Sequence, residues 1–175
     1  HEVIANLTDG RLVLRELSGA QTEHTAPPAP DTLNSIVRIT ARAEKVLVRG
    51  RDDAHFLYDR VKRSWVREWR DRAWGMALSP AEDRLAWGVD KKSEVVVEKL
   101  DRDGEATQLT SSFAQPVPLS FSPDGLMLAV GGVDEGGVEI FELSTGSIKH
   151  RLDTTAKHDF LPRTAWRFDS RAITL

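Results

Sequence analysis

The stretch that decides the fold runs from Pro116 to Leu152 and reads PVPLSFSPDGLMLAVGGVDEGGVEIFELSTGSIKHRL. Its apolar residues come in short runs with a period of two, which is typical of β-strands with one buried face. The run SPDG at residues 122–125 favours a tight turn and separates the first two of these runs. The stretch therefore predicts four antiparallel strands of one sheet, labelled a to d, at residues 117–121, 126–130, 138–143 and 147–152.

Copies of this pattern recur along the chain. The segment FSPDGLMLAVGG at residues 121–132 is echoed by LSPAEDRLAWGV at 78–89, by ITARAEKVLVRG at 39–50 and by the truncated FDSRAITL at 168–175. If Thr40, Ser79, Ser122 and Asp169 are equivalent positions, they are spaced by 39, 43 and 47 residues. These spacings bracket the roughly 40 to 45 residues of a four-stranded repeat.

The N-terminal residues predict part of one further repeat. Two apolar runs, at 3–6 and 11–17, flank Asp9-Gly10, a dipeptide that favours a tight hairpin turn. With a short strand at 21–25, the chain reads as strands bcd, abcd, abcd, abcd and ab. We therefore expect one continuous architecture over residues 1–175, with a partial unit at 1–30, complete units at 31–72, 73–112 and 113–155, and a partial unit at 156–175.

The stretch from Pro116 to Leu152 resembles a WD-repeat through its Ser-Pro-Asp-Gly turn, its small residues in strand b and its aromatic-acid pair Phe141-Glu142. The resemblance implies an all-β fold, a β-propeller of four-stranded antiparallel blades. The chain would hold three complete blades and two partial ones, as part of a larger ring of about seven blades. Because open blade edges are templates for strand pairing, we expect further polypeptide, from the same parent or another subunit, to complete the ring.

The other repeats depart from the family pattern. The Trp-Asp positions hold Arg15-Glu16, Tyr58-Asp59 and Glu98-Lys99, and the Gly-His dipeptide that precedes strand a in the family is missing. Without that dipeptide, the buried Asp-His-Ser network of the family is not expected. The blades are predicted to rely on apolar packing instead.

The composition narrows the classes of function. The chain has 24 Lys and Arg against 27 Asp and Glu, and this net charge of -3 provides no strong field to attract nucleic acid or an anionic membrane. It has no Cys, which favours a reducing compartment and hence a cytoplasmic location. No run approaches the roughly 20 apolar residues that span a bilayer. The first residue is not Met, so we expect either processing of the N-terminus or a longer parent protein.

No catalytic, cofactor-binding or metal-binding residue is predicted. The five His are never at the spacing of a metal-binding pair, and no Cys is available to complete a site. Neither a Gly-x-Ser-x-Gly sequence nor a phosphate-binding Gly-x-x-x-x-Gly-Lys sequence occurs. We therefore predict no cofactor and no enzymatic activity for this segment.

The segment from Asp59 to Trp74, DRVKRSWVREWRDRAW, alternates basic residues with Trp65, Trp69 and Trp74. Such aromatic residues can stack on nucleic-acid bases. The same alternation also fits an outer strand d that packs its aromatic side chains inward and keeps its charges in water. We favour the structural interpretation over a protein-binding surface, and we regard a nucleic-acid partner as the least favoured of the three.

By resemblance to the family, the loops from d to a and from b to c form the docking face. The function predicted is a protein-interaction scaffold that mediates assembly of a complex or recognises a partner. The alternative is the regulatory or sensor propeller of a larger enzyme, a peptidase or a signalling or defence effector, with catalysis elsewhere. The predicted partner-binding residues are charged and lie in these loops: Arg49, Arg51, Asp53, Lys91, Lys92, Asp134, Glu135 and His158.

Overall fold

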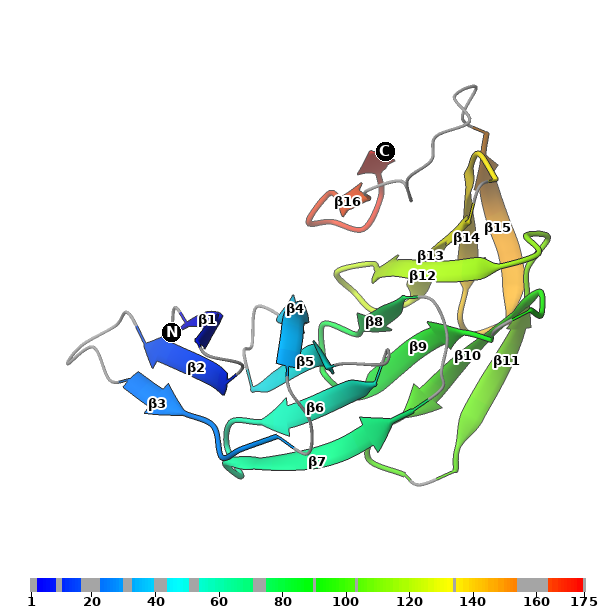
Figure 1. Ribbon diagram of the computed structural model, residues 1–175. Coiled ribbons are helices and arrows are strands. Elements are labelled where there is room, and N and C mark those ends of the chain that lie inside the picture. Colours follow the sequence, from blue (N-terminus) through cyan, green and yellow to red (C-terminus); the bar gives the residue numbers. More distant parts are fainter. Residues whose placement is uncertain are drawn as a thin grey trace. The chain divides into compact units, whose positions relative to one another are not determined.

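Every regular element in the described part of the chain is a β-strand (Figure 1). The computed structural model describes residues 3–8, 11–16, 23–29, 33–39, 44–50, 54–70, 75–89, 91–102, 104–133, 135–153 and 164–174. The chain divides into two compact units, His1–Asp71 and Arg72–Leu175, which are treated separately below. Over these described residues no helix has the length and apolar character needed to cross a membrane.

Unit 1 begins with a three-stranded antiparallel sheet, the first blade. Its strands are β1 (Val3–Thr8), β2 (Arg11–Glu16) and β3 (Glu23–Thr25), in the order β1-β2-β3. Thr8 pairs with Arg11, as expected for the tight hairpin predicted there. These strands are the predicted b, c and d of the first repeat.

The second blade completes unit 1 with four antiparallel strands in sequence order. They are β4 (Leu33–Ile39), β5 (Lys45–Gly50), β6 (His55–Asp59) and β7 (Ser64–Trp69). Strand β6 is buried along its whole length, as expected for an inner strand. One apolar cluster joins the first and second blades, formed by Leu12, Leu14, Ala26, Leu33, Val46, Val48, Ala54, Phe56 and Tyr58.

Unit 2 opens with the third blade, whose order is β11-β10-β9-β8. Its strands are β8 (Met76–Leu78), β9 (Arg84–Gly88), β10 (Glu94–Lys99) and β11 (Ala106–Thr110). The exposed fraction rises outward: β8 is wholly buried, whereas only Leu109 is buried in β11. Strand d therefore lies at the solvent edge.

The fourth blade is the WD-repeat-like stretch, and it forms the four-stranded sheet that its sequence predicts. Its strands are β12 (Pro116–Phe121), β13 (Met127–Gly132), β14 (Val138–Glu142) and β15 (Ser147–Leu152). One face of this sheet packs on the third blade through a shared apolar cluster. The cluster consists of Ala77, Ala86, Val95, Val97, Leu109, Phe113, Phe121, Leu128, Val130 and Phe141.

The two sheets approach so closely at Gly88 that only a glycine fits there. A Cβ atom built on Gly88 would lie 1.9 Å from the carbonyl oxygen of Pro116 in β12. Backbone cannot move aside as a flexible side chain can. The absence of a side chain at the end of β9 therefore sets the spacing of the third and fourth blades.

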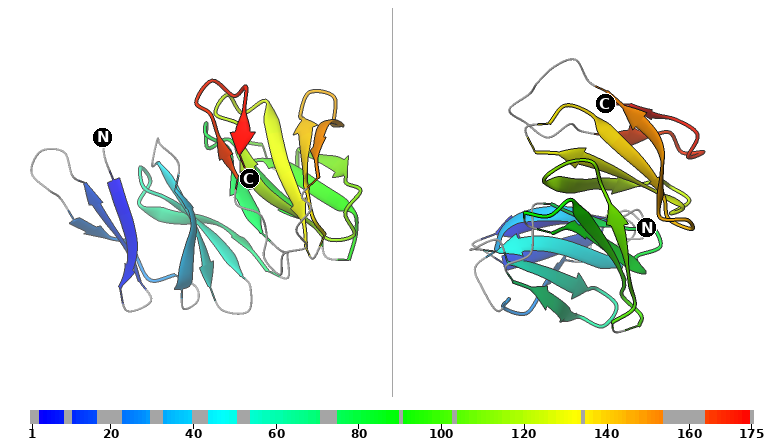
Figure 2. Two further views of the ribbon diagram at one scale, coloured as in Figure 1. Left: turned by 90° about the horizontal axis from the view of Figure 1, so that it is seen from above. Right: turned by 90° about the vertical axis from the view of Figure 1, so that its right-hand side faces the viewer.

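The last two strands, β16 (Ala165–Trp166) and β17 (Ile173–Thr174), form a hairpin. In both views of Figure 2 this hairpin, drawn in red, lies beside the fourth blade. Trp166 and Ile173 pack on its second face, against Ala129, Val138 and Ile140. The indole N–H of Trp166 also donates to Ser120 Oγ at 3.1 Å. Trp87 of β9 is buried and Trp166 is partly buried, so both tryptophans contribute to apolar packing.

The turn between strands a and b has the same backbone bonding in three blades. The turns begin at Ser79, Ser122 and Arg167. In each turn the N–H of this first residue donates to the carbonyl oxygen of the residue five positions later. The N–H of the residue three positions later donates to the carbonyl oxygen of the first residue. That third residue has a positive φ in each case, of 59°, 71° and 60° in chain order. The position equivalent to Ser122 in the last hairpin is therefore Arg167, and the proposed equivalence of Asp169 was wrong by two residues.

The observed sheets confirm the predicted fold class. Among the described residues, three sheets have four antiparallel strands, the first has three and the last has two, in the predicted sequence bcd, abcd, abcd, abcd and ab. Thr40, the fourth position of the proposed repeat alignment, lies outside the described residues. The number of blades in a complete ring stays a prediction.

Candidate protein-interaction surface

The loop that leads from the third to the fourth blade is anchored by one buried carboxylate. Glu139 of β14 is fully buried, and it accepts hydrogen bonds from Ser111 Oγ at 2.6 Å and from Ser112 Oγ at 2.5 Å. The backbone N–H of Ser112 also points at this carboxylate, 3.2 Å from each oxygen. This d-to-a loop is thus fastened to strand c of the blade that follows it.

Arg151 supplies the counter-charge. It lies directly across from Glu139 in the β14–β15 pairing, and its guanidinium donates to Oε1 at 2.6 Å. Burial alone would raise the pKa of Glu139, but the hydrogen bonds from Ser111, Ser112 and Arg151 outweigh it and hold the pKa below its ordinary value. Glu139 is therefore a charged, paired group inside the protein.

This network corrects the expectation that the blades rely on apolar packing alone. The sequence lacks the Gly-His dipeptide of the family, yet a buried polar network still ties the d-to-a loop to the fourth blade. It uses Glu139 on strand c, two serines in the loop and Arg151 on strand d. The alternation of residues in β14 could have indicated this network. Glu139 lies on the same face of the strand as Phe141, which is fully buried. An acidic side chain on a buried face needs hydrogen-bonding or charged partners.

The same loop braces the neighbouring loop that carries two exposed lysines. Lys91 and Lys92 lie between β9 and β10, and both are exposed. The Lys92 N–H donates to Val89 O at 3.1 Å, and the Ser111 N–H donates to Ser93 O at 2.8 Å. Lys91 adopts a positive φ of 56°. These bonds tie the backbone of Lys92 to Val89 and the backbone of Ser93 to the d-to-a loop.

Glu135, which is predicted to lie on the docking face, also holds the loop between the third and fourth blades by a hydrogen bond. It is half-buried in the b-to-c loop of the fourth blade, and Oε1 accepts a hydrogen bond from the Ala114 N–H at 2.7 Å. The segment 111–114 therefore links both b-to-c loops of unit 2. Arg49 is exposed, but it lies within β5 of unit 1, paired with His55, and not in a loop as predicted. Arg51, Asp53, Asp134 and His158 lie outside the described residues.

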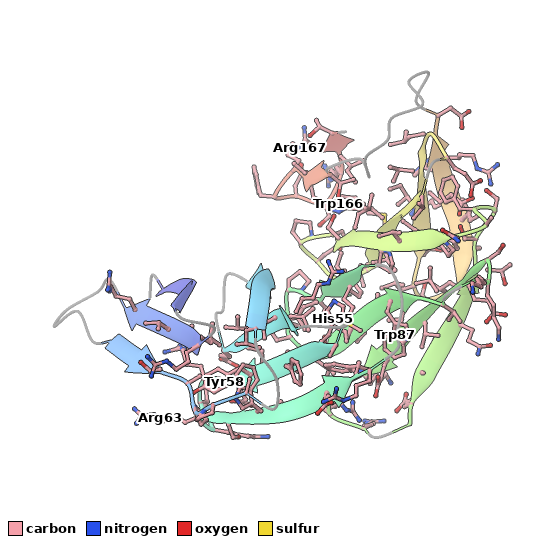
Figure 3. The ribbon with its side chains drawn as sticks, viewed as in Figure 1. His55, Tyr58, Arg63, Trp87, Trp166 and Arg167 are labelled. Atoms are coloured by element: carbon pink, nitrogen blue, oxygen red, sulfur yellow. The ribbon has the colours of Figure 1, made fainter. Side chains whose placement is uncertain are left out.

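The aromatic residues of the basic segment are packed within unit 1. Trp65 meets Tyr58 edge-on with ring centroids 5.1 Å apart, and its indole N–H donates to Pro27 O at 2.9 Å. Trp69 is buried, with the Arg67 guanidinium 5.9 Å from its ring centroid. This favours the structural interpretation for both tryptophans. Trp74 lies outside the described residues. Figure 3 shows Tyr58 and Arg63 within this part of the chain.

Two further features of the described residues bear on chemistry. No three His, Asp or Glu side chains in the described ranges come together in a way that could hold a metal ion. Between β10 and β11, Glu105 pairs with Lys99 and Arg102. Of the predicted partner-binding residues, the described part of unit 2 holds Lys91, Lys92 and Glu135.

No protein-family model matches the sequence, and no curated protein matches it. Solved structures do match. A chain of the structure titled "Crystal Structure of Mitotic Checkpoint Complex", a WD40 β-propeller, superposes with a TM-score of 0.67 at 16% identity, over 94% of this chain and 51% of that one. This chain has the fold of a WD-repeat-like β-propeller. A functionally unknown protein from Desulfotomaculum acetoxidans DSM 771 superposes on the propeller segment with a TM-score of 0.72 at 16% identity, over 98% of this chain and 57% of that one.

The propeller segment therefore spans little more than half the length of these two solved chains. At 16% identity the likeness shows the fold and leaves function to the residues of this chain.

Proposed function

We propose that this propeller segment is a protein-interaction scaffold that binds an acidic surface of a partner protein through the loop at Lys91 and Lys92. The observation that carries the proposal is the hydrogen bonding of the backbone at Lys92 and Ser93, which connects it to the loop that Glu139 anchors. An ordered loop loses little conformational entropy on binding. We propose no catalytic role for the segment and a cytoplasmic location for the protein.

The charge on this loop favours an acidic partner. Two adjacent ammonium groups attract a negative patch, which increases the rate of encounter and fixes the orientation of the partner. We further propose that additional polypeptide completes the propeller, because the two solved chains that superpose on this segment are almost twice its length. Assembly of a multi-protein complex through the loop face is the activity that this arrangement supports.

The test is mapped crosslinking of the tagged chain in cells that express it. An amine-reactive crosslinker should join Lys91 or Lys92 to acidic-flanked lysines of one reproducible partner, identified by mass spectrometry. With the double variant K91E/K92E, the recovered amount of that partner should fall at least about tenfold. The two new carboxylates would repel the acidic surface that the lysines attract. The matched control K62E reverses an exposed lysine outside these loops and should retain the partner. Equal recovery with K91E/K92E and with the unaltered chain would overturn the proposal.

A further inference from the structure

A pocket of about 240 Å³ opens between the third and fourth blades, beside the turn that joins strands a and b of the fourth blade. Its lining residues are Arg84, Leu126, Glu142, Leu143 and Ser144. Leu126 lies in the turn and is 62% exposed, so one apolar wall of the pocket is open to solvent. Leu143 is partly buried and packs on the apolar cluster that joins the two blades.

The pocket combines apolar walls with one cation. Arg84 lies 3.5 Å from Asp83, and its guanidinium is over the ring of Phe121, 6.0 Å from the centroid. The carboxylate of Glu142 is already matched by Lys149 at 3.3 Å. A guanidinium set among aliphatic side chains favours an aromatic ring, whose face carries a partial negative charge. The pocket therefore fits an aromatic side chain.

Phe168 presents such a side chain on the a-to-b turn of the last hairpin. It is 88% exposed, and among the described residues it is the only exposed Phe, Tyr or Trp. The Arg167 N–H donates to Ala172 O, and the Ser170 N–H donates to Arg167 O. The Arg167 guanidinium also donates to both carboxylate oxygens of Asp169, at 2.8 and 2.5 Å. The backbone of Phe168 is thus fixed while its ring lies in solvent.

The exposed side chain and the pocket lie on the same side of unit 2. The two a-to-b turns adjoin, because the Asp124 N–H donates to Ser170 Oγ at 3.0 Å. By the turn alignment above, Pro123 of the fourth blade is equivalent to Phe168. Pro123 is exposed although all four strands of its blade are present, so exposure belongs to this turn position. Phe168 and the pocket at Leu126 are therefore available together on the side of the a-to-b turns.

We propose that two copies of this chain pair through this side about a two-fold axis, with Phe168 of each copy in the pocket of the other. A two-fold interface uses the same patch twice, so a side that carries both the ring and its pocket is complementary to itself. Phe168 does not line the pocket of its own chain, and its turn is fixed, so the ring that enters comes from the second copy. This interface does not include Lys91 or Lys92, and it is independent of the proposed scaffold surface.

The test is sedimentation equilibrium of the full 175-residue chain. Because a small interface gives a weak complex, the range should run from about 1 to about 300 µM. The chain should show a monomer–dimer equilibrium with no larger species, and F168A and L126E should each weaken it at least about tenfold. The control V61E changes a valine of unit 1 that is 71% exposed and should leave the dimer unchanged. A monomer throughout this range, or full dimerisation of F168A, would overturn the proposal.

Mixing the two variants tests the pairing of ring and pocket directly. F168A keeps the pocket and L126E keeps the ring, so an equimolar mixture should form a dimer at a concentration where each variant alone is monomeric. A mixture that stays monomeric there would contradict the proposed contact.

Photocrosslinking locates the contact. The variant Phe168→benzoylphenylalanine, irradiated together with isotope-labelled unaltered chain, should crosslink to Leu126 or to residues 142–144 of the other copy. Crosslinks that map within one chain, or to another part of the second copy, would refute the inference.

Discussion

Replacing Glu139 by Gln should destabilise unit 2 far more than replacing any exposed acid of the same strand. Gln has nearly the same shape, but it carries no charge and offers one oxygen instead of two. Glu139 accepts from two hydroxyls, one backbone N–H and one guanidinium. In E139Q, an NH2 donor faces at least one of these donors, so a buried group is left without an acceptor.

The size of the effect follows from the burial of Glu139 and the exposure of Arg151. A hydrogen bond to a charged buried group contributes about 1.5 to 3 kcal/mol, and breaking a buried charged pair costs about 3 to 5 kcal/mol. Arg151 is 48% exposed, so water solvates its guanidinium when Glu139 is replaced. The loss of the Arg151 ion pair therefore contributes under about 1 kcal/mol to the destabilisation. The serine bonds dominate. We expect E139Q to lower the free energy of unfolding by about 3 kcal/mol.

The assay is urea unfolding of the full chain at pH 7, followed by circular dichroism. The matched control is E142Q, because Glu142 is on the same strand with a partly exposed side chain paired to Lys149. That change should cost less than about 0.5 kcal/mol. A loss in E139Q no greater than in E142Q would refute the assigned role of the network.

The same network predicts a dependence on pH. The pKa of Glu139 in the folded chain lies below its ordinary value of 4.5, so the unfolded chain takes up this proton first as the pH falls. The stability that the carboxylate contributes is complete above pH 4.5 and is lost as the pH falls through the lowered pKa. The unaltered chain should therefore lose more stability than E139Q between pH 5 and pH 3. Parallel losses would contradict the charge assignment.

Three other substitutions test the fold. Replacing a strand glycine by alanine normally raises the free energy of unfolding by about 0.5 to 1 kcal/mol. In G88A the clash with the Pro116 carbonyl should instead lower it by about 3 kcal/mol, measured by urea unfolding. W65F removes the bond to Pro27 and should cost about 1 to 2 kcal/mol, with faster hydrogen exchange in the first blade as the readout. S122A leaves the Met127 N–H in the a-to-b turn without its side-chain acceptor. We expect the free energy of unfolding to fall by about 1 to 2 kcal/mol, seen as a lower midpoint of thermal unfolding. An unchanged midpoint would contradict the assigned role of Ser122.

The blades could be predicted because their signals are local. The Ser-Pro-Asp-Gly turn and the period-two apolar runs lie within a few residues of the strands that they specify. The misassigned repeat in the last hairpin has an equally local cause. The turn at Arg167 is held by backbone bonds that any side chain permits, so matching Asp169 to Ser122 by side-chain type gave the wrong position.

The polar network could not be predicted in the same way because its partners are distant. Glu139 lies 27 and 28 residues from the two serines that donate to it. No periodicity links positions that far apart, and serine in a loop carries no signal of its own. The buried face of β14 does mark Glu139 as unusual, but only the fold shows which donors reach it.

The interface of the fourth blade with the last hairpin differs in one respect from its interface with the third. Toward the third blade, the apolar cluster is closed at the loop side by Glu139 and its serines, and at the turn side Arg84 lies 6.0 Å from the ring centroid of Phe121. Toward the hairpin, the turn side is also closed, since the Asp124 N–H donates to Ser170 Oγ at 3.0 Å. The apolar cluster on that face has three buried residues, Ala129, Val138 and Ile140, whereas the cluster toward the third blade has ten. Because inter-blade burial is the main source of stability in this architecture, the interface with the third blade should stabilise the fourth blade more than the interface with the last hairpin does.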